Sequence, residues 1–225
     1  MILVAGIIAL GLLGYAFVVR PRLVRWGATD AEVREPYPGA DIIPGGKRGT
    51  TMAITIDAPP SAVWPWLAQM GVDRGVWYTW DYWRPWGLRS TDRIHPEWQN
   101  IAVGFRMAAT PTGSTWWEVA ALEPERFLGL RMSVDHRGRR FDPKKQFPRF
   151  YSDSLWAFRL DQLPECRTRL VMSGYWAFRP TWLQNIVGFL FIEPSTWIMQ
   201  TRQLAGIKRR VERDARSRVP HVQYV

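Results

Sequence analysis

The first nineteen residues form an uninterrupted apolar run, MILVAGIIALGLLGYAFVV, without a charged side chain. As a helix rising 1.5 Å per residue, this run would span roughly 28 Å, close to the hydrocarbon thickness of a bilayer. A cleaved signal peptide is disfavoured because no basic residue starts the run and no small-residue cleavage site ends it. Arg20, Arg22 and Arg25 follow it, so the positive-inside rule leaves the N-terminus outside. The pattern predicts a transmembrane helix over residues 1–19, in a single-pass protein of the cell membrane with a cytoplasmic domain.

After this run, the pattern predicts a connector and then a domain. Residues 20–49 are basic and rich in Pro and Gly, which is typical of an extended connector without regular elements of its own. Strict alternation predicts a strand over residues 51–57. The spacing of Val63, Trp66, Leu67 and Met70 predicts a short helix, which Pro65 kinks or delays.

The rest of the domain alternates in the manner of strands until its last helix. Strand-like runs lie at residues 105–109, 115–122, 127–134, 154–160 and 168–178. The run at 182–192 is too short to span a membrane, and we expect it to pack in the core, with insertion into the membrane interface and a hydrophobic lip of the cavity as the alternatives. An imperfect apolar stripe predicts a long helix over 196–216. This order predicts one α+β domain over residues 50–216, an antiparallel sheet covered on one face by the C-terminal helix, with a tail at 217–225.

Three segments in this order resemble the SRPBCC, or START-like, superfamily, which includes polyketide cyclase/dehydrase-like proteins. They are TMAITIDAPPSAVWPWLAQMG, DRIHPEWQNIAVG and IEPSTWIMQTRQLAGIKRR. The resemblance implies a helix-grip fold, in which a curved antiparallel sheet wraps around the long C-terminal helix and encloses an apolar cavity. It implies a ligand-binding cavity but no reaction, because members of the superfamily include lipid carriers, hormone receptors and cyclases.

Residues 72–98 are dense in aromatic and polar side chains and show no sustained period. Aromatic walls with a few polar groups are typical of a cavity for an apolar ligand that bears one polar end. The same residues would equally suit the core and rim of an irregular loop. The side chains expected to line the cavity are Trp77, Tyr78, Trp80, Arg93, His95, Trp98, Trp117 and Trp156.

Candidates for proton transfer lie in the same stretch. His95 with Asp81, Asp92 or Glu97 would form an acid–base pair, and Tyr78 is a further candidate. A structural hydrogen bond is the favoured interpretation of His95. No Gly-x-Ser-x-Gly elbow occurs, and the single cysteine, Cys166, falls in a predicted hairpin turn. These residues favour a binding protein over an enzyme.

The composition narrows the possible cofactors and partners. The three histidines are far apart, and no phosphate-binding glycine loop is present, so we expect no metal and no cofactor. The net charge of +10 gathers in clusters that lack a nucleic-acid recognition motif. Anionic headgroups of a membrane are the expected partner of these clusters, with an ordinary solvated helix face as the alternative. The sequence leaves the oligomeric state open.

Three functions remain open from the sequence. The first is a membrane-anchored START-like domain that binds a lipid or another hydrophobic small molecule in an internal cavity. The second is a polyketide cyclase/dehydrase-like enzyme that uses the same cavity. The third is a non-catalytic structural protein of the membrane surface, whose cavity is filled by its own side chains.

Overall fold

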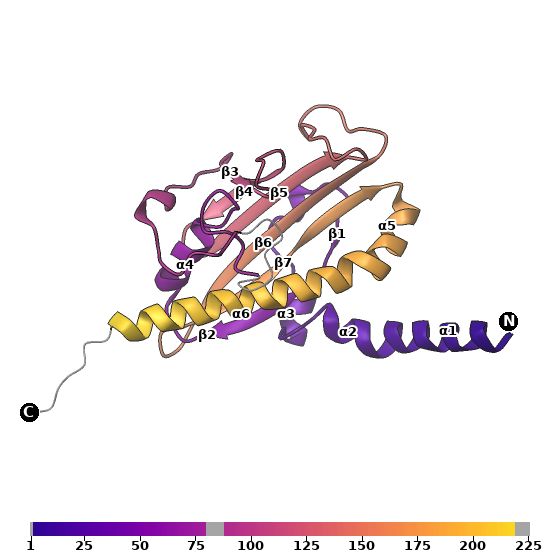
Figure 1. Cartoon of the computed structure of the whole chain (residues 1–225), viewed down its shortest axis with the longest axis horizontal. Helices are drawn as coiled ribbons and strands as arrows, with labels where there is room; N and C mark the ends of the chain where they lie inside the picture. The colour runs from indigo at the N-terminus through magenta and orange to yellow at the C-terminus, as the bar shows by residue number, and fades with distance from the viewer. Residues whose placement is uncertain (1, 80–87, 219–225) are drawn as a thin grey trace, which may run out of the picture.

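The computed structural model describes residues 2–79 and 88–218. A seven-stranded antiparallel sheet forms the body of the domain, and a long helix, α6 (Glu193–Arg218), crosses one of its faces (Figure 1). The strands lie in the order β1-β7-β6-β5-β4-β3, and β2 also pairs with β7. Their bounds are β1 (Lys47–Arg48), β2 (Met52–Ile56), β3 (Arg106–Ala108), β4 (Trp116–Glu123), β5 (Phe127–Asp135), β6 (Tyr151–Leu163) and β7 (Arg167–Arg179).

The face under α6, called the inner face below, carries the larger core. Leu130, Phe158 and Met172 point to it from three neighbouring strands and are fully buried. Leu204 and Ile207 of α6 pack against them, at a spacing that places both on one side of the helix. The shorter helix α4 (Pro60–Ala68) adds buried side chains from the predicted apolar positions Val63, Trp66 and Leu67. The prediction of an α+β domain with its C-terminal helix on an antiparallel sheet is confirmed, and the arrangement is consistent with a helix-grip fold.

The opposite, outer face of the sheet is covered by the segment expected to be a connector without regular elements. This segment forms α3 (Asp30–Arg34), the 3-10 turn η2 (Ala40–Ile42) and β1. Tyr37 and Ile43 are buried there against Leu155, Ala157 and Val171 of the sheet. The expectation of an extended connector was wrong. It rested on the Pro and Gly residues, which interrupt helices and strands, but Tyr37 and Ile43 between them are apolar side chains that the sheet buries.

The apolar N-terminal run forms two helical elements, α1 (Ile2–Gly14) and the π-helical stretch η1 (Tyr15–Val19), and α2 (Arg20–Leu23) follows it. The 13 residues of α1 span about 20 Å at the α-helical rise, against the roughly 30 Å of a hydrocarbon core. In residues 2–79 and 88–218, no helix combines the length and the apolarity needed to cross a membrane. The predicted single-pass anchor, with its outside N-terminus and cytoplasmic domain, is therefore wrong.

The last connection of the fold also differs from expectation. Residues 181–192 form α5 (Thr181–Val187) and the π-helical stretch η5 (Gly188–Ile192), which lead directly into α6. Trp182, Ile186 and Phe191 are exposed, so the prediction that this run packs in the core is wrong. The reason is geometric, because the run follows the end of β7 and lies beyond the part of the sheet that α6 covers (Figure 1).

Candidate functional site

Three tryptophans meet on the inner face of the sheet. The ring centroids of Trp117 of β4 and Trp156 of β6 are 5.4 Å apart. The ring of Trp77, from the loop after α4, also contacts Trp156, with centroids 5.4 Å apart. All three are only partly buried. Gly174 lies directly opposite Trp156 in the register of β6 and β7 and adds no side chain beside its indole. The structure thus brings together three of the residues expected to line a cavity.

Three further aromatic residues extend the lining along the inner face. The alternation of β7 places Trp176 on this face, where its ring lies 6.5 Å from that of Phe178. Trp197 of α6 packs against the inner core from the helix side. Trp176, Phe178 and Trp197 are partly buried, as the first three tryptophans are. The inner face therefore has a fully buried part under α6 and an aromatic part that solvent still reaches.

Two indole N–H groups of this lining lack a hydrogen-bond partner. The Nε1 atoms of Trp156 and Trp197 are shielded from solvent and contact no acceptor among the described residues. A buried donor without an acceptor costs about 1–3 kcal/mol. The lining therefore contains hydrogen-bond donors that the described residues leave unsatisfied.

The loop that presents Trp77 is held in a strained conformation. Val76 and Tyr78, on either side of Trp77, have φ values of 63° and 58°, a region that side-chain-bearing residues rarely adopt. Gly206 of α6 allows the close approach, because a Cβ there would collide with the carbonyl oxygen of Tyr78. Such strain persists only where surrounding contacts enforce it, and it is common at binding and catalytic sites.

A second cluster, made of polar groups around Gln69, holds the neighbouring loops. The Gln69 side-chain amide donates to the Tyr78 hydroxyl at 3.0 Å, and its carbonyl accepts from the His95 backbone N–H at 3.1 Å. Burial raises the pKa of Tyr78 above its usual range, so the phenol stays protonated near neutral pH. Gln69 and Tyr78 are fully buried. Tyr78 therefore acts here as a fixed structural group.

His95 is engaged at both ring nitrogens. Nδ1 lies 3.0 Å from a Glu97 carboxylate oxygen, and Nε2 lies 3.1 Å from the Thr91 hydroxyl. Its ring stacks on Trp98 with centroids 3.9 Å apart, and the exposed Arg93 reaches Nε2 at 3.4 Å. Of the expected acid partners, Glu97 is the one that contacts His95, whereas Asp92 pairs with Arg210. This geometry suits a structural role for the ring.

Arg210 of α6 ties the two loops to the helix. It is 1% exposed, although the sequence places it in a basic cluster expected to face headgroups or solvent. Its Nε donates to the Thr91 carbonyl at 2.9 Å and lies 3.3 Å from a carboxylate oxygen of Asp92. Its guanidinium lies 5.1 Å from the centre of the Tyr78 ring. Arg210 therefore positions the loops that border the aromatic lining.

The sequence analysis missed several members of this site, and two of the residues that it proposed cannot be compared with the structure. Gln69, Arg210, Trp176 and Trp197 were not proposed, and Gln69 alone carried a signal, as a polar residue between the apolar Ala68 and Met70. Trp80 and Asp81 lie outside the described residues. Among the described residues, no group of three or more His, Cys, Asp or Glu side chains is arranged to hold a metal ion.

Two surface hollows lie away from the aromatic lining. One is bordered by the start of α4 and the turn between β4 and β5, including Pro60, Ser61 and Arg126. The other lies between α2 and β1 and includes Arg20, Val24 and Arg48. Neither is the enclosed cavity between sheet and helix that the superfamily resemblance implies.

Comparisons with known proteins found likenesses among solved structures. No family model and no curated protein matches this chain. Among solved structures, a protein from Mesorhizobium loti is similar at 20% identity and a TM-score of 0.43, over 72% of this chain and 97% of its own. The Zhui aromatase/cyclase from a Streptomyces species is similar at 16% identity and a TM-score of 0.36, over 76% and 97%. A polyketide-cyclase-like protein from Corynebacterium glutamicum is similar at 19% identity and a TM-score of 0.35, over 80% and 99%.

These likenesses assign neither a family nor an activity to this chain.

Proposed function

We propose that this protein binds an apolar small molecule carrying a hydrogen-bond acceptor, against the aromatic part of the inner face. The observation that supports this function best is the pair of shielded, unpartnered indole N–H groups of Trp156 and Trp197 within a partly exposed aromatic surface. Binding sites for small molecules are mostly apolar, with a few polar groups that fix the orientation of the ligand.

The shape of the lining supports a ligand that contacts several aromatic rings at once. Trp156 contacts both Trp77 and Trp117, and the strained loop at Val76 and Tyr78 fixes Trp77. A preorganised surface loses less conformational entropy on binding, which favours affinity. A carboxylate, carbonyl or ether oxygen on the ligand would accept from the free indole N–H groups.

The residues that the structure describes give no support for a reaction. His95 is bonded at both ring nitrogens, and the Tyr78 hydroxyl is buried against Gln69. A general acid or base must reach the proton that it transfers. We therefore assign binding and no catalytic step.

The test compares two tryptophans on opposite faces of the sheet. Trp156 and Trp116 are both partly buried, and both have an unpartnered Nε1, but Trp116 faces the outer side beside Arg106 and Arg140. The probe is cis-parinaric acid, a fluorescent fatty acid with a carboxylate acceptor. We expect W156F to weaken its binding at least about tenfold, the loss of one hydrogen bond to a charged acceptor, and W116F to leave it unchanged.

Native mass spectrometry of the full chain supplies the second measurement. A reproducible co-purifying apolar molecule, lost in W156F and kept in W116F, would support the proposal. The proposal is refuted if the wild type does not bind the probe, or if W156F and W116F bind it as tightly as the wild type does.

A further inference from the structure

The exposed large apolar side chains gather at one end of the molecule. Among the described residues, all of them except Val103 and Phe150 belong to two segments. The first segment is α1 with η1, and the second is α5 with η5 and the start of α6. Together the exposed members are Val4, Ile7, Leu10, Leu12, Leu13, Phe17, Val18, Val19, Trp182, Ile186, Leu190, Phe191, Ile192, Ile198 and Met199. We call this surface the apolar end.

The two segments are far apart in sequence and lie side by side in space. The Tyr15 ring packs edge-on against Phe189 with centroids 4.9 Å apart, and the Tyr15 hydroxyl donates to the Phe189 carbonyl at 3.1 Å. Arg20 donates to both carboxylate oxygens of Glu193, at 2.6 and 2.8 Å. These contacts join η1 and α2 to η5 and the start of α6, and α1 continues from this junction away from the sheet (Figure 1).

This surface differs from the ordinary scattered exposure of apolar residues. Residues 2–19 contain no charged side chain, so α1 has no charged face to turn to water. Contiguous apolar patches of this kind mark sites that bind a protein, a membrane or a ligand. The apolar end is also distinct from the aromatic lining of the inner face, because it is built from other residues.

We infer that the apolar end docks on a lipid surface, lying in the headgroup and upper acyl region without crossing the bilayer. Charge at its border favours this partner. Arg22 and Lys47 lie beside the two segments and bond to neutral groups, the Val18 carbonyl and the Asn185 side chain. Apolar side chains bordered by cations are typical of protein surfaces that bind anionic membranes.

A second copy of this chain is the competing occupant. A two-fold interface would bring the same surface of each chain together, and with it the cations at each border. The chain carries a net charge of +10, which adds repulsion between copies and attraction to anionic lipid.

The experiment uses flotation of the full chain with vesicles of phosphatidylcholine containing one-third phosphatidylglycerol. Bound protein floats with the vesicles, whereas aggregated protein sinks. The variants F17D and F191D place a charge on each segment, at side chains that are 76% and 65% exposed. V103D is the matched control, since Val103 is 65% exposed and lies outside the apolar end. We expect each of the first two variants to lose at least about tenfold in vesicle affinity and V103D to keep it.

A fluorescent label reports which surface enters the lipid. Cys166 is the chain's single cysteine and is exposed in the turn between β6 and β7, at the end of these strands away from α5. An environment-sensitive nitrobenzoxadiazole label at position 191, in F191C/C166S, should shift its emission to the blue when vesicles are added. The same label on native Cys166 should not shift.

The outcomes separate the two occupants. The lipid inference is overturned if the wild type stays at the bottom of the gradient, if V103D loses as much affinity as F191D, or if the label at Cys166 shifts instead. Sedimentation velocity decides the competing case. If F17D and F191D turn a dimer into a monomer without changing flotation, the apolar end is an interface between two copies.

Discussion

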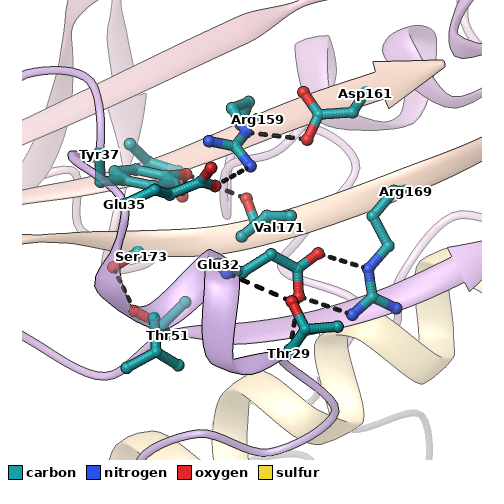
Figure 2. A network of polar contacts seen from close by, with 12 residues as sticks. Thr29, Glu32, Glu35, Tyr37, Thr51, Arg159, Asp161, Arg169, Val171 and Ser173 are labelled. Atoms are coloured by element: carbon teal, nitrogen blue, oxygen red, sulfur yellow. Dashed lines mark hydrogen bonds and ion pairs between the residues drawn. The ribbon is translucent and has the colours of Figure 1, made fainter.

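Glu32 of α3 accepts two hydrogen bonds from Arg169 of β7, at 2.7 and 2.9 Å, and this pair fastens the N-terminal segment to the outer face of the sheet (Figure 2). Glu32 also closes a capping box with Thr29, in which each residue's side chain bonds to the other's backbone N–H. Glu35 forms a parallel contact with Arg159 at 2.6 Å. The segment that covers the outer face is thus held by ion pairs as well as by Tyr37 and Ile43.

The Glu32 carboxylate makes the stability of the protein depend on pH in the acidic range. Burial acts to raise its pKa, but the hydrogen bonds from Arg169 and Thr29 outweigh it and lower the pKa to about 2. The unfolded chain has a pKa of about 4.3 at this residue, so the stabilisation is complete above that pH and is lost as the pH falls through 2. The total is about 2–3 kcal/mol.

Urea denaturation of the wild type and E32Q checks this dependence. We expect E32Q to be less stable by about 2 kcal/mol near neutral pH, and the difference to shrink steadily below about pH 4. The control is E165Q, whose side chain is 79% exposed and whose partner Arg167 lies 3.5 Å away. A constant difference between wild type and E32Q down to about pH 2 would contradict the assignment.

Asp153 is the more costly acid to remove. It is 1% exposed, accepts from Arg131 at 3.0 and 2.6 Å, and accepts from the Ser133 hydroxyl at 2.8 Å. Loss of one partner leaves a partly buried guanidinium uncompensated, so D153N should lower the free energy of unfolding by about 3 kcal/mol. E165Q should change it by less than about 0.5 kcal/mol. Thermal or urea unfolding measures both, and equal effects would rule out the difference in burial as the cause.

Gly206 couples α6 to the loop that carries Trp77. In G206A the new methyl group would collide with the Tyr78 carbonyl, which should cost about 1–3 kcal/mol, offset in part by the higher helix propensity of alanine. The displaced loop should also weaken the binding of cis-parinaric acid. G11A is the matched control, because Gly11 is also helical and an added Cβ there meets open space. If G206A is as stable as G11A, the close approach does not constrain the loop.

Strands β2 to β7 and the helices α4 and α6 follow from the sequence, because their patterns are local. The alternation in residues 51–57 and 168–178 predicts β2 and β7, and both lie as expected within a residue or two of their observed ends. Successive side chains of a strand point to opposite faces of the sheet, so the alternation of apolar and polar residues shows which side chains of each strand face the core. Trp117 and Trp156 were both expected to line the cavity, but their contact depends on the order of the strands, which the local pattern does not give.

Only the tertiary structure shows which residues of distant segments contact one another. Nothing in the composition of residues 20–49 shows that Glu32 meets Arg169, or that Tyr37 is buried against the sheet. The apolar run at the start of the chain matches a membrane-spanning length when counted in residues, yet the helix divides at Tyr15, where it meets Phe189. The sequence therefore determined the elements and their faces, since these depend on near neighbours. The tertiary structure decided the segment that covers the outer face, the polar cluster around Gln69 and the apolar end. These features depend on contacts between side chains that are far apart in the sequence, and a local pattern does not show such contacts.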